Sequence, residues 1–175
     1  GKRVRNLTFL AAPAAKLAAA SFRRAFMEKT ASWSVVIEEC RTRSEAAALL
    51  SAKKSHAFVV SAPFRRAVFE AGKIQGASAR LAQGADILYR GGKNTLAVSQ
   101  YARVAIDEME RLFLPLYGAN AVVLGSGSAA LDVVYECARA GVNEITLLGS
   151  EKECTRNNLL AFLEAFGKER TQIID

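Results

Sequence analysis

The chain has 175 residues, of which 51% are hydrophobic and 23% charged, and its formal net charge is +7. This composition is typical of a globular protein of one or two small domains, and no apolar run approaches the roughly 20 residues that a membrane-spanning helix needs. The three cysteines show no metal-binding spacing, so we expect reduced, buried thiols in a cytoplasmic protein without a metal site.

The charge is unevenly distributed along the chain. Residues 1–70 carry 13 Lys and Arg against 5 Asp and Glu, whereas residues 71–175 carry 11 against 12. A basic first half could attract an anionic ligand. The basic residues are scattered, however, and they lack the interleaved aromatic side chains of a nucleic-acid surface. We therefore favour a solvated basic face over nucleic-acid binding.

Apolar runs and turn-forming residues predict an α/β domain in the first two thirds of the chain. Strands are expected at residues 6–10, 33–37, 57–60, 87–89 and 95–98, and helices at residues 14–29, 45–53, 64–71 and 100–114. Pro115 and Gly118 end the last helix, so we expect a first domain over residues 1–117 and a second over residues 118–175.

The second domain begins with a strand, a glycine turn and a helix. Four apolar residues at 121–124 run into Gly125-Ser-Gly127-Ser-Ala-Ala130, and an amphipathic run over 130–140 follows. A strand at 144–148, a helix at 152–166 and a strand at 171–174 complete the pattern. This order corresponds to half of a dinucleotide-binding sheet. We therefore expect the domain to continue beyond Asp175.

The glycines of this loop suit phosphate binding. The first allows a tight turn, the second lets a phosphate approach the backbone, and the small Ala130 lets helix and strand pack closely. The N–H groups at the helix start then form an anion site. The alternative is a glycine turn in another α/β fold that binds nothing.

A further landmark precedes this loop. A strand that ends in Val59-Val-Ser61-Ala-Pro63-Phe-Arg65 lies upstream of the glycine turn. The two landmarks together resemble the shikimate dehydrogenase family, in order and spacing, from Phe9 to about Leu163. The resemblance implies an α/β substrate domain, a Rossmann domain that binds NAD(P), and oxidoreductase chemistry of the quinate and shikimate pathway.

The N-terminal motif of that family carries two serines that hold the substrate carboxylate. In this chain Pro13 matches the motif, whereas Leu17 and Ala19 occupy the two serine positions. Lys16 lies beside them and is a candidate for binding a carboxylate.

The proton-transfer residues implied by the resemblance are also replaced. Ser61 stands for a threonine, and Arg65 stands for the catalytic lysine. A guanidinium stays protonated near neutral pH and cannot relay a proton as a lysine of lowered pKa can. The partner aspartate of the family aligns with Gln100, or with Ala102 if the alignment slips by two residues, so that carboxylate is absent on either alignment. Asp86 falls in a different element of the family pattern. Arg65 and Gln100 mark the catalytic positions; the substrate-binding candidates are Lys16, Ser61, Arg65 and Gln100. Ser61 could instead cap the next helix.

The cofactor side of the resemblance is better preserved. The cofactor-binding candidates are Gly125, Ser126, Gly127, Ser128, Ala129, Gly149, Ser150 and Glu151. Gly149, Ser150 and Glu151 occupy the positions where the family has Asn-Arg-Thr. In the family, the arginine of that motif binds the 2′-phosphate of NADP. Glu151 could accept a hydrogen bond from a ribose 2′-hydroxyl, which favours NAD over NADP.

Three functions fit these features. The first is a pseudoenzyme that serves as a regulatory or ligand-sensing module, cytoplasmic or nuclear, with a protein partner, as in regulators of the quinate-repressor type. Such a module need not bind a cofactor. The alternative is a divergent NAD(P)-dependent dehydrogenase that acts on shikimate, quinate or a similar hydroxy-carboxylate, with Tyr89, Tyr101 or His56 as proton relay. The third is an unrelated α/β binding module.

Overall fold

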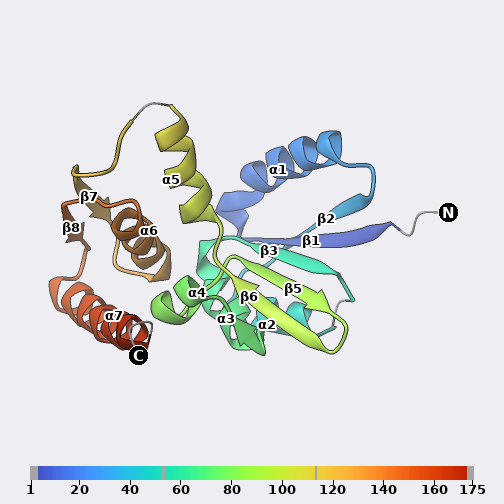
Figure 1. Cartoon of the computed structure of the whole chain (residues 1–175). Coiled ribbons are helices and arrows are strands. Elements are labelled where there is room, and N and C mark those ends of the chain that lie inside the picture. Colours follow the sequence, from blue (N-terminus) through green and yellow to red (C-terminus); the bar gives the residue numbers. More distant parts are fainter. Residues whose placement is uncertain (1–3, 53, 113, 173–175) are drawn as a thin grey trace. The chain divides into compact units, whose positions relative to one another are not determined.

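The computed structural model describes residues 4–52, 54–112 and 114–172 (Figure 1). The chain forms two compact units, the first from Gly1–Gly76 and Gly84–Val98 and the second from Ala77–Gln83 and Ser99–Asp175. The first unit has a mixed sheet with helices, and the second has a parallel β-α-β-α arrangement. The predicted α/β class, with a substrate-type unit followed by a partial Rossmann unit, is confirmed.

The sheet of the first unit has six strands in the order β2-β1-β3-β5-β6-β4. The strands are β1 (Arg5–Ala11), β2 (Trp33–Glu39), β3 (Ala57–Val60), β4 (Ile74–Gln75), β5 (Ile87–Gly91) and β6 (Asn94–Val98). β1 pairs in parallel with both β2 and β3, whereas β5 runs antiparallel to β3 and to β6. Gly92, at φ 59°, lies in the β5–β6 turn, where glycine adopts a positive φ without strain.

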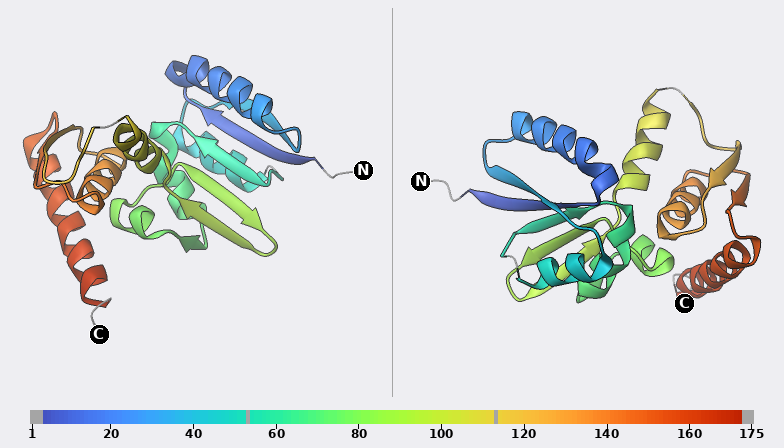
Figure 2. Two further views of the ribbon diagram at one scale, coloured as in Figure 1. Left: turned by 45° about the horizontal axis from the view of Figure 1, so that its top comes forward. Right: turned by 180° about the vertical axis from the view of Figure 1, so that it is seen from behind.

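Helices lie on both faces of this sheet (Figures 1 and 2). The helical elements are η1 (Pro13–Ala15), α1 (Lys16–Lys29), α2 (Arg43–Ala52), η2 (Ala62–Phe64) and α3 (Arg65–Ala71). On the α1 face, Phe22 and Phe26 pack against a buried cluster that includes Leu7, Phe9 and Val35. The opposite face carries α2 and α3. Alternate residues of β1 are therefore buried on opposite sides, which explains why its last five residues are all buried.

Two short elements were not predicted from the sequence. Residues 72–86 have mixed composition, and they contain β4 and the helix α4 (Ala77–Ala82). Gly72 allows β4 to approach β6, because a Cβ at this position would lie 2.6 Å from the Cβ of Ala97. The small side chains at this point therefore have a packing role.

The second unit is built on a parallel pair of strands, β7 (Asn120–Leu124) and β8 (Glu144–Leu148). Helix α6 (Ser128–Arg139) connects them, and α7 (Lys152–Gln172) follows β8. α5 (Tyr101–Arg111) and α4 both pack on α6. The buried core combines apolar residues of β7 and of the helices α4, α6 and α7: Leu81, Ala82, Val123, Ala130, Leu131, Val134 and Phe162.

The structure corrects one predicted element of this unit. The sequence predicted a helix over 152–166 and a strand over 171–174, but α7 continues to Gln172, so residues 171 and 172 are helical. Residues 173 and 174 lie outside the described residues. The segment 167–172 contains Glu, Arg, Lys and Gln, which have high helix propensity and allow the helix to continue.

The two units divide after Val98, whereas the predicted domain boundary lies between residues 117 and 118. The difference arises because α5 packs on α6 and is counted with the second unit. The division into a first domain over residues 1–117 and a second over residues 118–175 stays a prediction. Within the described ranges, no helix is long and apolar enough to span a bilayer.

Candidate functional site

In the first unit, several predicted residues follow the carboxyl ends of β1 and β3. η1 and α1 follow β1, and η2 and α3 follow β3, so each strand leads into a helical turn with proline near its start. Ligands of open α/β sheets bind outside the carboxyl ends of parallel strands. Lys16, Ser61 and Arg65 are positioned by these two connections.

Arg65 forms a buried ion pair with Asp86. One terminal guanidinium nitrogen (Nη1) lies 3.0 Å from Oδ2 of Asp86, and the two side chains are only 5% and 1% exposed. The backbone fixes both residues, because the N–H of Ala85 donates to the carbonyl of Arg65, and the N–H of Val60 donates to the carbonyl of Asp86. Neither Gln100 nor Ala102 supplies a carboxylate, as expected from the sequence, but Asp86 provides one to Arg65 from another element. The partner comes from the residue that precedes β5.

Asp86 is the buried ion-pair partner that the sequence reasoning missed. It was assigned to another family element, although an aspartate directly before the apolar run Ile87–Tyr89 was a usable signal. A charged residue next to a buried strand needs a charged or hydrogen-bonding partner, because an isolated buried carboxylate is very costly. Arg65 meets that requirement.

Ser61 connects the ends of two strands. Its hydroxyl accepts a hydrogen bond from the N–H of Ala12, at 2.8 Å, and its own N–H donates to the carbonyl of Leu10. The side chain makes no capping bond to η2, which corrects the interpretation of Ser61 as a helix cap. Ser61 is 8% exposed. In this structure it joins the loop after β1 to the end of β3.

Lys16 lies in a surface cluster of charges. Its Nζ is 2.8 Å from Oε2 of Glu39, and a guanidinium nitrogen of Arg41 is 3.1 Å from Oε1 of the same carboxylate. The hydrogen bond from Lys16 is the main cause that lowers the pKa of Glu39, and the charges of Lys16 and Arg41 add to it. Two cations share one carboxylate, so the cluster keeps an excess positive charge.

The remaining predicted positions of the substrate side lie on α1 and directly before α5. Both residues belong to α1: Ala19 is fully buried, and the side chain of Leu17 is exposed to solvent. Gln100 precedes α5 and belongs to the second unit.

Two of the alternative proton relays lie at the amino end of β3. Tyr89 pairs with Ala57, at the amino end of β3, and His56 immediately precedes that strand. Nδ1 of His56 accepts a hydrogen bond from the N–H of Asn6 at 3.0 Å. These two side chains are therefore at the end of β3 opposite to Ser61. Tyr101 lies on α5 in the second unit.

The glycine loop of the second unit has the geometry of a tight strand-to-helix turn. Gly125 has φ 130°, a region that side chains rarely adopt, and its N–H donates to the carbonyl of Leu148 at 2.8 Å. Gly127 is the N-cap of α6 with an extended backbone. A Cβ on Gly127 would meet no described atom within 4 Å. The first glycine is thus needed for conformation, while the second leaves open space beside the helix N-terminus.

The turn after β8 packs against this loop. A Cβ on Gly149 would overlap the hydroxyl of Thr155 and would lie 2.9 Å from the Cβ of Ser126. Ser150 and Glu151 are exposed, and the carbonyl of Glu151 accepts the first hydrogen bond of α7, from the N–H of Thr155. The cofactor candidates at residues 125–129 and 149–151 therefore lie on two adjacent turns.

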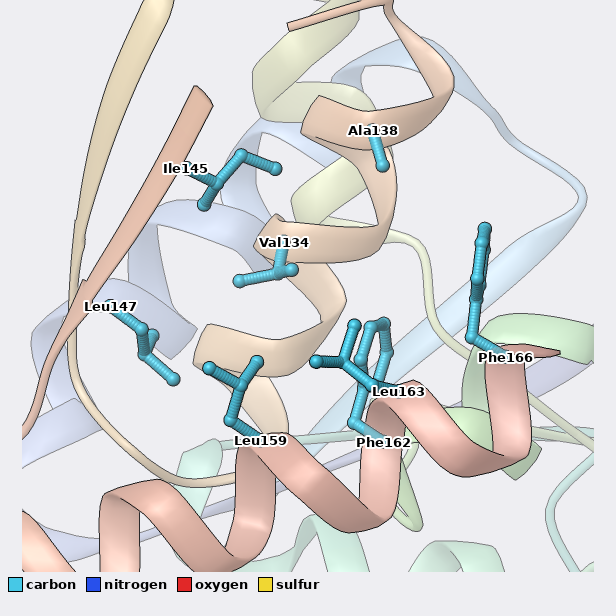
Figure 3. A pocket seen from close by; sticks show the side chains of 8 residues that line it. All are labelled: Val134, Ala138, Ile145, Leu147, Leu159, Phe162, Leu163 and Phe166. Carbon is cyan, nitrogen blue, oxygen red and sulfur yellow. The ribbon is translucent and has the colours of Figure 1, made fainter. Parts of the chain in front are cut away.

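An apolar cavity of about 210 Å³ lies between α6, β8 and α7 (Figure 3). Val134 of α6, Ile145 and Leu147 of β8, and Phe162 of α7 line it. Its lining offers no charged group that could bind a phosphate or a carboxylate. We therefore assign it to the packing of the unit rather than to the candidate site.

Comparison with solved structures identifies the architecture. A shikimate dehydrogenase from Listeria monocytogenes, crystallised with shikimate and NAD, matches with a TM-score of 0.74 and 14% identity over 94% of this chain. The chain has the fold of the shikimate dehydrogenases. A 5-ketofructose reductase from Gluconobacter sp. strain CHM43 matches with a TM-score of 0.74 and 18% identity over 94% of the chain. A shikimate dehydrogenase in complex with NADP+ matches with a TM-score of 0.73 and 17% identity over 92%.

The chain covers only part of the length of these structures. The chain spans 58%, 60% and 56% of the length of these three structures, respectively. No protein-family model and no curated protein sequence matches it. The likeness to the solved structures is thus one of fold.

Proposed function

We propose that this chain is a ligand-sensing module with the shikimate dehydrogenase fold, which binds a nicotinamide dinucleotide at the glycine loop and has lost the proton-transfer chemistry of a dehydrogenase. The observation that carries this proposal is the buried ion pair between Arg65 and Asp86, at the position where the resemblance implies a catalytic lysine.

The ion pair argues against proton transfer for two reasons. A general acid or base must change its protonation state near neutral pH, and a guanidinium does not. The carboxylate of Asp86 is already engaged in the ion pair, with its Oδ2 3.0 Å from Nη1 of Arg65. Both side chains are almost fully buried, so a substrate hydroxyl could reach them only if the packing around η2 opened.

The dinucleotide part of the proposal rests on the two turns of the second unit. A helix N-terminus beside an open glycine offers backbone N–H groups to a pyrophosphate. Glu151 is exposed at the end of β8, where an acidic side chain can accept a hydrogen bond from a ribose 2′-hydroxyl. The same carboxylate would repel a 2′-phosphate, so NAD is the expected ligand in preference to NADP.

A sensing role implies a second component that recognises the ligand-bound form of this module. We propose that this component is a protein partner, as in regulators that contain a module of this fold. A small anionic carboxylate is the further ligand to be tested. It would bind near Lys16 and Arg41, where two cations share Glu39.

The alternative function is a divergent NAD(P)-dependent dehydrogenase. The preserved geometry of the glycine loop favours it, because hydride chemistry belongs to the cofactor and the protein needs to supply only positioning and one proton relay. The neighbour that is a 5-ketofructose reductase makes a polyol or hydroxy-ketone the substrate class to include.

Titration calorimetry with NAD, NADP, shikimate and quinate, each added separately, tests the proposal. We expect NAD to bind, and we expect no reduction of NAD or NADP with shikimate or quinate at enzyme concentrations that suffice for slow turnover. Turnover would establish the dehydrogenase instead. Failure of both dinucleotides to bind would show that the glycine loop is structural only, and the sensing proposal would then fail.

A further inference from the structure

Asn158, on the second turn of α7, contacts the glycine loop directly. Its side-chain nitrogen Nδ2 donates a hydrogen bond of 2.8 Å to the backbone carbonyl of Ser126. The same nitrogen lies 3.7 Å from the sulfur of Cys154, one helical turn earlier. Asn158 is partly buried, so the bond is partly shielded from water. No sequence feature had drawn attention to this residue.

This hydrogen bond fixes the orientation of one peptide plane. In a trans peptide the carbonyl of one residue and the N–H of the next point in opposite directions, and the described chain has no cis peptide bond. When the carbonyl of Ser126 points to Asn158, the N–H of Gly127 points away from α7. Gly127 is also the residue whose Cβ position is open. The bond therefore directs the N–H of Gly127 away from Asn158, at a residue whose Cβ position is open.

A second contact holds Ser126 from the direction of β8. The backbone of Gly149 lies so close to Ser126 and Thr155 that no larger residue fits without movement. Thr155 is itself fixed, because its hydroxyl donates to the carbonyl of Glu151 at 2.7 Å. Ser126 is thus restrained at its carbonyl by Asn158 and at its side chain by Gly149.

From these contacts we infer that Asn158 is a positioning residue for dinucleotide binding, which acts by orienting the Ser126–Gly127 peptide so that the N–H of Gly127 faces the pyrophosphate. This inference rests on the proposed function, since it concerns the same site. Asn158 itself does not contact the ligand. Without its side-chain amide, the peptide plane is free to rotate, and the loop would present a carbonyl oxygen to the phosphate for part of the time.

The test compares three variants of the 175-residue chain by calorimetry with NAD. Asn158→Leu keeps the side-chain size and removes the donor, Asn158→Gln restores a donor, and Asn157→Leu is the matched control on the same helical turn, where the side chain is exposed. We expect NAD to bind about tenfold more weakly to Asn158→Leu, as for the loss of one well-placed hydrogen bond. Asn158→Gln should recover part of the affinity, and Asn157→Leu should match the wild type.

The thermal midpoint, measured in parallel, separates positioning from simple packing. A lower midpoint with unchanged NAD affinity in Asn158→Leu would assign Asn158 to helix packing and overturn the inference. If the wild type binds no NAD, the proposed function fails and this role fails with it.

A measurement without ligand tests the orientation itself. The ¹⁵N–¹H resonance of Gly127 should shift in Asn158→Leu and stay in place in Asn157→Leu. An unmoved Gly127 resonance in Asn158→Leu would overturn the inference whether or not NAD binds.

Discussion

The guanidinium of Arg65 and the carboxylate of Asp86 meet at 3.0 Å, although 21 positions of sequence separate them. Arg65 begins α3 directly after η2, and Asp86 directly precedes β5. Because β5 runs antiparallel to β3, its first residues lie beside the end of β3. The ion pair therefore fixes the connection after β3 to the start of β5, in the interior of the first unit.

Removal of one partner of this pair should be strongly destabilising. We expect Asp86→Ala to lower the free energy of unfolding by about 3–5 kcal/mol, since it leaves an uncompensated buried guanidinium. The combined change Arg65→Met with Asp86→Leu should cost far less, because both charges are removed together. Urea denaturation measures both. Equal losses in the single and the double variant would contradict a dominant role for the charge.

Restoring the family residues should not restore catalysis. We expect the double variant Arg65→Lys with Gln100→Asp to show no shikimate-dependent formation of reduced NAD or NADP. The physical reason is that Leu17 has no polar group and Ala19 is fully buried, so neither can hold the substrate carboxylate. Absorbance of the reduced nicotinamide is the measurement. Appreciable turnover would show that the alignment of the N-terminal motif is wrong.

The two glycines of the loop should respond differently to substitution. Gly125→Ala should lower the free energy of unfolding by about 1–3 kcal/mol, because φ 130° is strained for a residue with a Cβ. Gly127→Val should leave stability nearly unchanged, since its Cβ position is open, but should abolish NAD binding by blocking the pyrophosphate. Denaturation and calorimetry on both variants provide the check. Wild-type affinity in Gly127→Val would make the loop purely structural.

The Lys16–Glu39 pair predicts a pH dependence of defined sign. The pKa of Glu39 is lower in the folded chain than its ordinary value, chiefly because Lys16 donates a hydrogen bond to it. A lowered carboxyl pKa contributes stability above the ordinary value, and this contribution is lost as the pH falls through the folded pKa. Lys16→Met should therefore be less stable than the wild type at neutral pH, and the difference should shrink in acid. A difference that is constant with pH would mean that Lys16 acts through packing instead.

The sequence predicted most of the elements, because strands and helices here follow local patterns of apolar residues and glycines. Alternating or continuous apolar runs identified β1, β2, β3, β7 and β8, and the glycines identified the β5–β6 turn and the strand-to-helix turn. Local patterns did not reveal the pairing of Arg65 with Asp86, which depends on the direction of β5. They also missed Asn158, since its role depends on which carbonyl lies opposite α7.

At the end of α7, a local sequence pattern predicted a strand where the structure has a helix. The sequence from Thr171 to residue 174 is typical of the start of a strand, yet Thr171 and Gln172 belong to the helix. A short β-favouring segment cannot outweigh a helix that is already formed on its amino side, because extending a helix is easier than starting a new element. The roles of the cofactor candidates stay predictions until ligands are titrated.

Helix α4 has a consequence for how the protein could be divided. The chain leaves the first unit after Gly76, contributes α4 to the second, returns at Gly84, and leaves again after Val98. Leu81 and Ala82 of α4 are part of the core of the second unit. A fragment cut at residue 117 would thus carry two core residues away from the unit they stabilise. The two units therefore cannot be cloned or exchanged separately by a single cut in the sequence. Partial unfolding of the second unit must also loosen α4, which lies in sequence between the two parts of the first unit.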